Sequence, residues 1–284
     1  MNKGGICFFT VFFMLSNSLL AQDTLNVSNR SKKDFLDNKF PRISQHSISL
    51  GIVGTNIYTD YLSHLPYQGL QGGILYQGDK SFAKKLMQDW EIQIEGGGLH
   101  SPAKNYSYYS AMLHLHWGVL CPVYKHPNFQ ILVGGQLQTE IGGFYLPAYG
   151  NSAAVLNANI SLNAAFRLDY KFFLGKQPMQ LHYQLALPLL GLVFAPEYGM
   201  SYYEIFTKIY SPEHYLSFAS VYNNFSMQNM VALDFVFKTV QLRFSYVGHS
   251  LWSNLKGIHS QWHGNAFYVG FVLNMVNMSG KETL

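Results

Sequence analysis

Charged residues are scarce in this chain. Asp, Glu, Lys and Arg make up 12% of its 284 residues, about half of the ~25% that is usual in soluble domains. So few charges do not cover a water-soluble globule of this size. Cysteine is also scarce, because the chain has 2 and only Cys121 lies outside the N-terminal apolar segment. One cysteine forms no internal disulfide, and without a clustered His/Cys set it indicates neither structural zinc nor a redox pair.

Long apolar runs are missing as well. The longest run after the N-terminal segment, Leu185 to Ala195, is interrupted by Pro188 and Gly191 and is far shorter than the ~20 residues of a transmembrane helix. Aromatic residues and glycine are abundant instead, with 21 Phe, 20 Tyr and 25 Gly, while the mean hydropathy is +0.02. Low charge, many aromatics and no spanning run together favour a transmembrane β-barrel.

The N-terminal segment has the organisation of a secretory signal. Lys3 precedes an apolar run from Ile6 to Leu15, and Ala21 offers a cleavage position, so we predict a signal peptide over 1–21. Residues 22–43 are polar and aperiodic and are expected to form a periplasmic arm. Their basic residues have no interleaved aromatics, which does not indicate nucleic-acid binding.

The stretch from Val155 to Phe172 alternates strictly. Its even positions are apolar or aromatic, and its odd positions are mostly Asn, Ser and charged residues. Strands of soluble sheets are about 5–6 residues long. A strand this long with one apolar and one polar face fits a barrel wall between lipid and a polar lumen.

Similar alternation runs through the rest of the chain. The fold class is therefore all-β: a transmembrane antiparallel β-barrel of about 12 strands over 44–276, with 10 or 14 as alternatives, followed by a polar tail at 277–284. The strands are expected at 44–58, 68–78, 88–99, 107–121, 128–143, 154–173, 178–190, 201–208, 214–222, 229–238, 240–250 and 263–275. The strand at 201–208 is required by the sides on which the turns lie. The short turns at 174–177 and 238–239 belong on the same, periplasmic side, so an even number of strands must lie between them.

Hairpin registers predict which residues face the lumen, since directly paired residues share a face. A turn at 238–239 pairs Asp234 with Arg243, and a turn at 174–177 pairs Asp169 with His182. A turn near Lys125 brings His114 towards Gln136. The residues expected to face the lumen are His114, His116, Gln136, Glu140, Asn157, Asn159, Arg167, Asp169, His182, Asp234 and Arg243.

Two groups of residues could carry chemistry, one as a hydrolase site and one as a metal site. A hydrolase at the rim would use His249, Ser250, Ser253 and Asn254, because a histidine can activate a serine that an amide steers. These residues are instead expected in a polar extracellular loop between the last two strands. His114 and His116, one residue apart near Glu140, carry a weak metal-binding signal; they are expected to be hydrogen-bonded lumen residues, so no metal site is predicted.

The segment Leu192 to Met200 has more apolar and aromatic content than a solvated loop needs. It is expected to be either an extracellular loop or a partial plug of the barrel mouth, with Phe194, Pro196 and Tyr198 as the plug residues. The glycine-rich pieces open no helix and lack a phosphate-loop pattern, so no cofactor is expected.

Several segments resemble an uncharacterised family of Gram-negative outer-membrane proteins, domain-of-unknown-function family 3316. The matching segments are 42–51, 55–58, 188–191, 196–199, 201–206 and 253–256, together with the closing strand at 263–275. The resemblance implies a secreted barrel of the outer membrane. It implies no activity and no catalytic residues.

These observations predict a non-enzymatic, monomeric barrel, exported to the periplasm and inserted in the outer membrane. Its expected partners are outer-membrane lipid and the barrel assembly machinery. Its role is expected to be a narrow channel for a small polar solute, or a surface-binding or structural barrel. The alternatives are a lipid or lipopolysaccharide hydrolase at the rim and a soluble secreted lipid-binding β-protein.

Overall fold

The structure is a computed structural model that describes residues 44–61, 63–83, 86–104, 107–147, 154–200, 205, 207, 211–237 and 240–275. The predicted signal peptide (1–21), periplasmic arm (22–43) and polar tail (277–284) lie outside the described residues. The strands are β1 (Ser44–Thr59), β2 (Ser63–Ala83), β3 (Leu86–His100), β4 (Ser107–Lys125), β5 (Phe129–Tyr145), β6 (Ala154–Leu174), β7 (Gln177–Phe194), β8 (Leu216–Ser220), β9 (Asn224–Val236), β10 (Gln241–Leu255) and β11 (Ile258–Met275), with one 3-10 turn, η1 (Pro212–His214).

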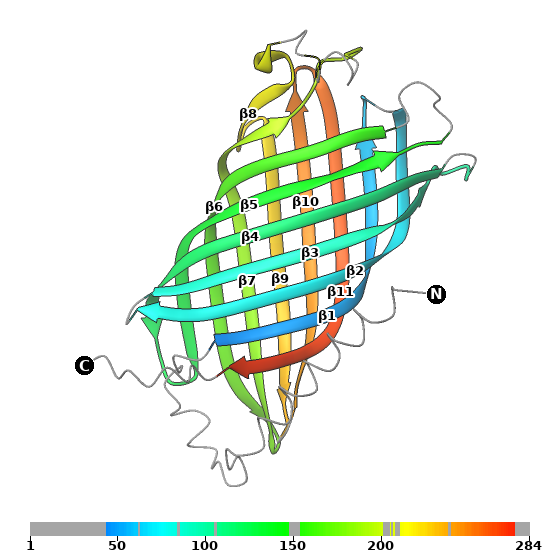
Figure 1. The fold of residues 1–284 in the computed structure, drawn as a ribbon. Coiled ribbons are helices and arrows are strands. Elements are labelled where there is room, and N and C mark those ends of the chain that lie inside the picture. Colours follow the sequence, from blue (N-terminus) through cyan, green and yellow to red (C-terminus); the bar gives the residue numbers. More distant parts are fainter. Residues whose placement is uncertain are drawn as a thin grey trace, which may run out of the picture. The chain divides into compact units, whose positions relative to one another are not determined.

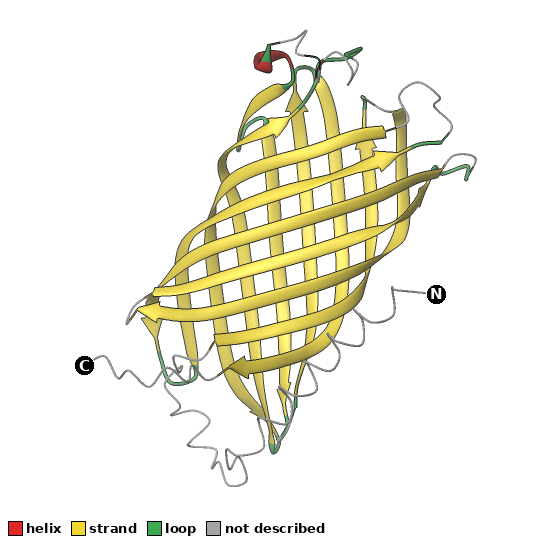
Figure 2. Ribbon diagram, viewed as in Figure 1, coloured by secondary structure: helices red, strands yellow, loops and turns green. Residues whose placement is uncertain are grey.

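Ten of these strands close an antiparallel barrel (Figure 1). Strands β1 to β7 pair in chain order, β7 pairs with β9, and β9, β10 and β11 continue the wall until β11 pairs with β1. Figure 2 shows that strands make up nearly all of the described chain. No helix within the described ranges is long and apolar enough to cross a bilayer.

The barrel has ten strands, the lower alternative to the predicted number of about twelve, because β8 and β9 together occupy one place in the wall. Leu190 of β7 pairs with Ser220 of β8, and Ala186 of β7 pairs with Gln228 of β9. Both strands therefore run antiparallel to β7, with a turn between them. At 201–208, where a strand was predicted, the described residues are helical (Ile205) and in a turn (Thr207). Ten and twelve strands leave the short turns on the same side, so parity alone did not distinguish them.

Two hairpin registers are as predicted. Asp169 pairs with His182 across the β6–β7 turn, and Asp234 pairs with Arg243 across the β9–β10 turn. The first turn contains Gly175 at φ +65°, a left-handed conformation that favours glycine.

The predicted register of β4 with β5 was wrong by four residues. His114 pairs with Glu140 rather than with Gln136. The cause is the position of the turn: β4 continues to Lys125, and a register shift occurs between Pro122 and Tyr124. The correction places a carboxylate directly opposite a histidine in the lumen.

The outer surface carries an apolar belt that ends before the strands do. Outward-facing Phe271, Phe267 and Leu50 are 55%, 65% and 66% exposed, which suits contact with lipid. Further along β11 the outward positions become polar, with Asn265, Gln261 and His259 all exposed. Spanning a bilayer takes about 9–11 strand residues, whereas β11 has 18 residues. It therefore extends well beyond the belt, at the end of the barrel opposite the β6–β7 and β9–β10 turns. We call this end the outer end.

Candidate functional site: the barrel interior and its outer mouth

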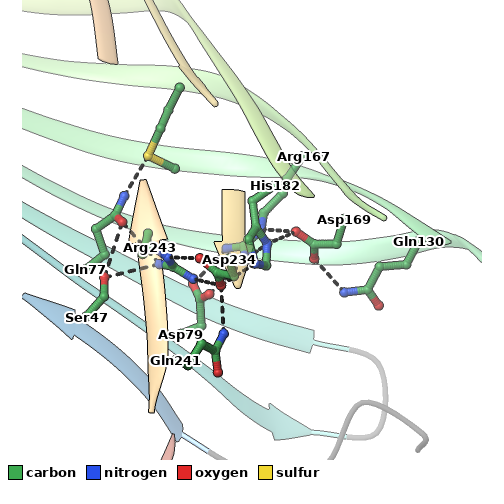
Figure 3. A network of polar contacts seen from close by, with 11 residues as sticks. Ser47, Gln77, Asp79, Gln130, Arg167, Asp169, His182, Asp234, Gln241 and Arg243 are labelled. Carbon is green, nitrogen blue, oxygen red and sulfur yellow. Dashed lines mark hydrogen bonds and ion pairs between the residues drawn. The ribbon is translucent and has the colours of Figure 1, made fainter. Parts of the chain in front are cut away.

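An ion-pair network fills the lumen near the end of the barrel that carries the β6–β7 and β9–β10 turns (Figure 3). We use this name for Asp79, Arg167, Asp169, His182, Asp234 and Arg243. Arg167 on β6 donates to both carboxylate oxygens of Asp79 on β2, at 2.7 Å each, and its Nε donates to Asp169 at 2.8 Å. The first of these contacts crosses the lumen, because β2 and β6 are not neighbours in the wall.

The second arginine is held in the same way. Arg243 donates through Nε and Nη2 to the two oxygens of Asp234, at 2.7 and 2.8 Å. His182 joins the two halves, because its ring nitrogens lie 2.6 Å from Asp169 and 3.2 Å from Asp234. Apart from Asp79, whose side chain is 19% exposed, these charges are almost fully buried. They are satisfied by one another, as buried ionic groups must be. They therefore occupy the lumen with side chains.

A second polar layer lies farther towards the outer end. This histidine layer consists of Glu91, Glu95, His114, His116, Glu140 and His249. Glu140 lies 3.4 Å from His114 Nδ1 and 3.3 Å from His249 Nε2, while His116 Nδ1 lies 3.3 Å from Glu91. Gln77 joins the two polar layers, because it accepts from Arg243 at 3.2 Å and donates to Glu91 at 3.0 Å. The interior also holds an apolar cluster of Val53, Leu75, Met230, Val247, Ala266 and Tyr268.

An aromatic cap covers the histidine layer on the outer side. The buried side chains of this cap are Ile57, Tyr67, Leu99, Tyr108, Met112, Phe144, Leu146 and Trp262. The Tyr67 and Tyr108 rings lie 3.8 Å apart between centroids, and Trp262 contacts the rings of His114 and His249 at 6.0 and 5.9 Å. The described lumen is therefore filled by connected polar side chains, an apolar cluster and an aromatic cap.

An open hollow of about 130 Å³ lies above the cap, at the barrel mouth. We call it the outer hollow. Its floor includes Trp262, Phe144 and Ile57, and its wall includes Leu251 of β10 and Phe194 at the end of β7. The hollow lies at the same end of the barrel as the polar outward positions of β11 that begin at Asn265.

Next to the hollow, a turn residue has a perturbed acidity. Asp60 accepts a hydrogen bond of 2.5 Å from the Tyr58 hydroxyl, and this bond lowers the pKa of the Asp60 carboxyl. Burial raises the pKa of the nearby Tyr61 phenol, whose hydroxyl donates to the Met200 carbonyl at 3.2 Å.

The residues expected to face the lumen lie as follows. Asn157 lines the outer hollow and is partly exposed. The others are buried: His114, His116, Gln136, Glu140, Asn159, Arg167, Asp169, His182, Asp234 and Arg243. The sequence analysis missed Asp79, Glu91 and Glu95, which contact this set, and Ser226, which contacts His249. The alternation of β3, where Glu91, Gln93 and Glu95 share a face, was the signal that could have found two of them.

The four residues considered for a hydrolase at the rim do not form a catalytic group in the structure. His249, Ser250, Ser253 and Asn254 lie on strand β10, so the extracellular loop predicted for them was wrong; the turn comprises only residues 256 and 257. His249 faces the lumen, where its Nε2 contacts both Ser226 Oγ at 3.2 Å and Glu140. Ser250 instead contacts His263 at 3.3 Å.

The His249 contacts do not make a catalytic relay. In a serine-histidine-acid triad, the serine and the acid use different ring nitrogens. Here Ser226 and Glu140 both approach Nε2, and Nδ1 has no hydrogen-bonding partner within the described structure. Similarly, in the part of the chain that the structure describes, no three His, Cys, Asp or Glu side chains are grouped so as to hold a metal ion.

The segment considered as a plug continues the wall. Phe194 still belongs to β7, and the Ala195 and Glu197 amides donate to the Tyr215 and His214 carbonyls at 2.8 and 3.2 Å. Pro196 lines the outer hollow, whereas Tyr198 is 79% exposed. The segment therefore shapes one side of the mouth.

Comparison with known proteins gives a family and a fold. A family profile described as "Protein of unknown function (DUF3316)" matches residues 7–282, and no curated protein matches the chain. Among solved structures, the outer-membrane protease OmpT from Escherichia coli has a TM-score of 0.50 at 9% identity, covering 88% of this chain and 100% of that one. The transport unit of the autotransporter AIDA-I from Escherichia coli has a TM-score of 0.47 at 8% identity, covering 93% and 97%.

Proposed function

Because the chain belongs to DUF3316, a family of proteins of unknown function, we propose its role from geometry: an outer-membrane barrel with a closed lumen that binds at its outer mouth. The fold and the apolar belt support insertion in the outer membrane. The outer end is the one that carries the long β7–β8 connection and the extended β10–β11 hairpin.

The filled lumen carries this proposal. A channel needs a continuous water path lined by polar groups. Here the ion-pair network joins side chains across the barrel, and the aromatic cap places Tyr108 and Leu99, exposed to 1% and 0%, on the same axis. The surface-binding role among the sequence-based expectations is therefore better supported than the solute channel.

Cysteine accessibility tests the closed lumen directly. The native Cys121 is first replaced by Ser, and single cysteines are placed at Ser253 in the outer hollow and at Ser245, which is 4% exposed inside the barrel. On intact cells, a membrane-impermeant maleimide should label Ser253→Cys and leave Ser245→Cys unlabelled. The purified protein should also show no conductance steps in planar bilayers.

Equally fast labelling of both cysteines, or regular conductance steps, would show an open channel and end the proposal. An open porin reconstituted in the same bilayers controls for insertion. The rim hydrolase has less support, because His249 touches neither Ser250 nor Ser253. Ester release by the wild type that is lost in His249→Ala would revive it.

A further inference from the structure

The outer hollow has the size of a small-molecule site. Its volume of about 130 Å³ is close to that of an engineered protein cavity of roughly 150 Å³ that binds benzene. It opens outward, and its floor is closed by Trp262, which is 3% exposed. A ligand can therefore enter from the external side but does not pass on into the lumen.

The lining of the hollow contrasts with the rest of the interior. The described residues that line it include no Asp, Glu, Lys, Arg or His, although both deeper polar layers are rich in them. Aromatic and aliphatic side chains dominate, including Ile57, Phe144, Phe194, Leu251 and Trp262. Transfer of a charged group from water into such a lining is costly, because no side chain of opposite charge lines the hollow to compensate its lost hydration. The occupant should be neutral.

One polar side chain in the wall is set apart from the others by its burial, because Asn157 and Ser253 also line the hollow but are partly exposed. Asn224 is 3% exposed and lines the hollow. Its backbone pairs with Ser253, and its side chain is part of the lining of the hollow. A side-chain amide in such a lining both donates and accepts hydrogen bonds. It therefore favours a ligand that supplies one hydrogen-bonding group.

We propose that the outer hollow binds a neutral, single-ring aromatic molecule that carries one hydrogen-bonding group, with the ring on the apolar floor and the polar group at Asn224. This inference deepens the proposed binding role of the mouth and rests on it. In a closed barrel the site holds its ligand for recognition, rather than passing it inward.

Binding can be measured with 4-fluorophenol as the probe, by ¹⁹F NMR relaxation on the full-length mature protein in lipid nanodiscs. Empty nanodiscs of the same lipid correct for partition into the bilayer. Asn224→Ala should weaken 4-fluorophenol binding by about 3- to 10-fold, the effect of one neutral hydrogen bond, while binding of fluorobenzene changes by less than about 2-fold. The negatively charged 4-fluorobenzoate should not bind.

Leu251→Trp fills the hollow and should abolish binding of both neutral probes. Heat-dependent migration in SDS gels shows that each variant is folded. Equal binding of 4-fluorophenol to the wild type and to folded Leu251→Trp, or equal binding of 4-fluorobenzoate, would overturn the inference. If the lumen is closed but neither neutral probe binds, this inference is refuted and the proposed closure stands. If the barrel conducts ions and 4-fluorophenol binding still depends on Asn224, only the proposed closure is refuted.

Discussion

At the scale of single residues, the most consequential positions are charges that face inward. Asp234 is 0% exposed and accepts hydrogen bonds from Arg243, Gln241 and His182. Leaving a buried charge without its partner costs far more than losing a surface pair. The alternation of β9 and β10 placed Asp234 opposite Arg243 from sequence. The contact between Arg167 and Asp79 could not be predicted in this way, because no hairpin joins β2 to β6.

Asp234→Asn should therefore lower the free energy of unfolding by about 3–5 kcal/mol, since it leaves Arg243 buried with a weaker partner. The matched control is Asp60→Asn in the β1–β2 turn, where we expect little change in the free energy of unfolding, because solvent screens this carboxylate. Both values come from denaturant unfolding of the barrel in lipid vesicles. Similar losses in the two variants would contradict the assigned importance of the ion-pair network.

At the scale of elements, the end of β7 and the short strand β8 form one continuous ladder at the mouth. The ladder extends past Phe194 through the backbone bonds of Ala195 and Glu197. From sequence, the aromatic content of Leu192 to Met200 was compatible with either a plug or a loop. Tertiary pairing with residues 214–220 decided the place of this segment. That pairing joins residues that lie some twenty positions or more apart in the chain.

Deleting Glu197 to Gly199 should leave the barrel closed, because the aromatic cap and the ion-pair network lie below this segment and do not include it. Planar-bilayer recordings of the deletion variant should show no conductance steps, as for the wild type. Steps that appear only after the deletion would assign the segment to a plug instead.

At the scale of the whole molecule, ten strands rather than twelve enclose the interior. A narrower barrel brings opposite walls close enough for side chains to meet. That is why Arg167 on β6 reaches Asp79 on β2 across the lumen. The difference in strand number follows from β7 pairing directly with β9, a neighbour that the twelve-strand arrangement did not allow.

A disulfide tests that neighbour relation. Tyr183 and Val231 are paired on β7 and β9, and paired residues have Cα separations of about 4.5–5.5 Å, within the range of a disulfide. With Cys121 replaced by Ser, the variant Tyr183→Cys/Val231→Cys should cross-link on mild oxidation, detected by a thiol-dependent shift in gel migration.

The offset pair Tyr183→Cys/Leu233→Cys serves as the control, because diagonal positions lie about 7–8 Å apart. Cross-linking of the offset pair in preference to the matched pair would contradict the ten-strand closure.

The sequence by itself determined, along each regular strand, which residues face outward and which face inward, because side chains of a strand alternate with a period of two. It also determined the hairpins whose turns are short and well marked. Only the tertiary structure decided the strand number, the position of the β4–β5 turn and the contacts across the lumen. These depend on pairing between segments far apart in the chain and on the barrel width that follows from that pairing.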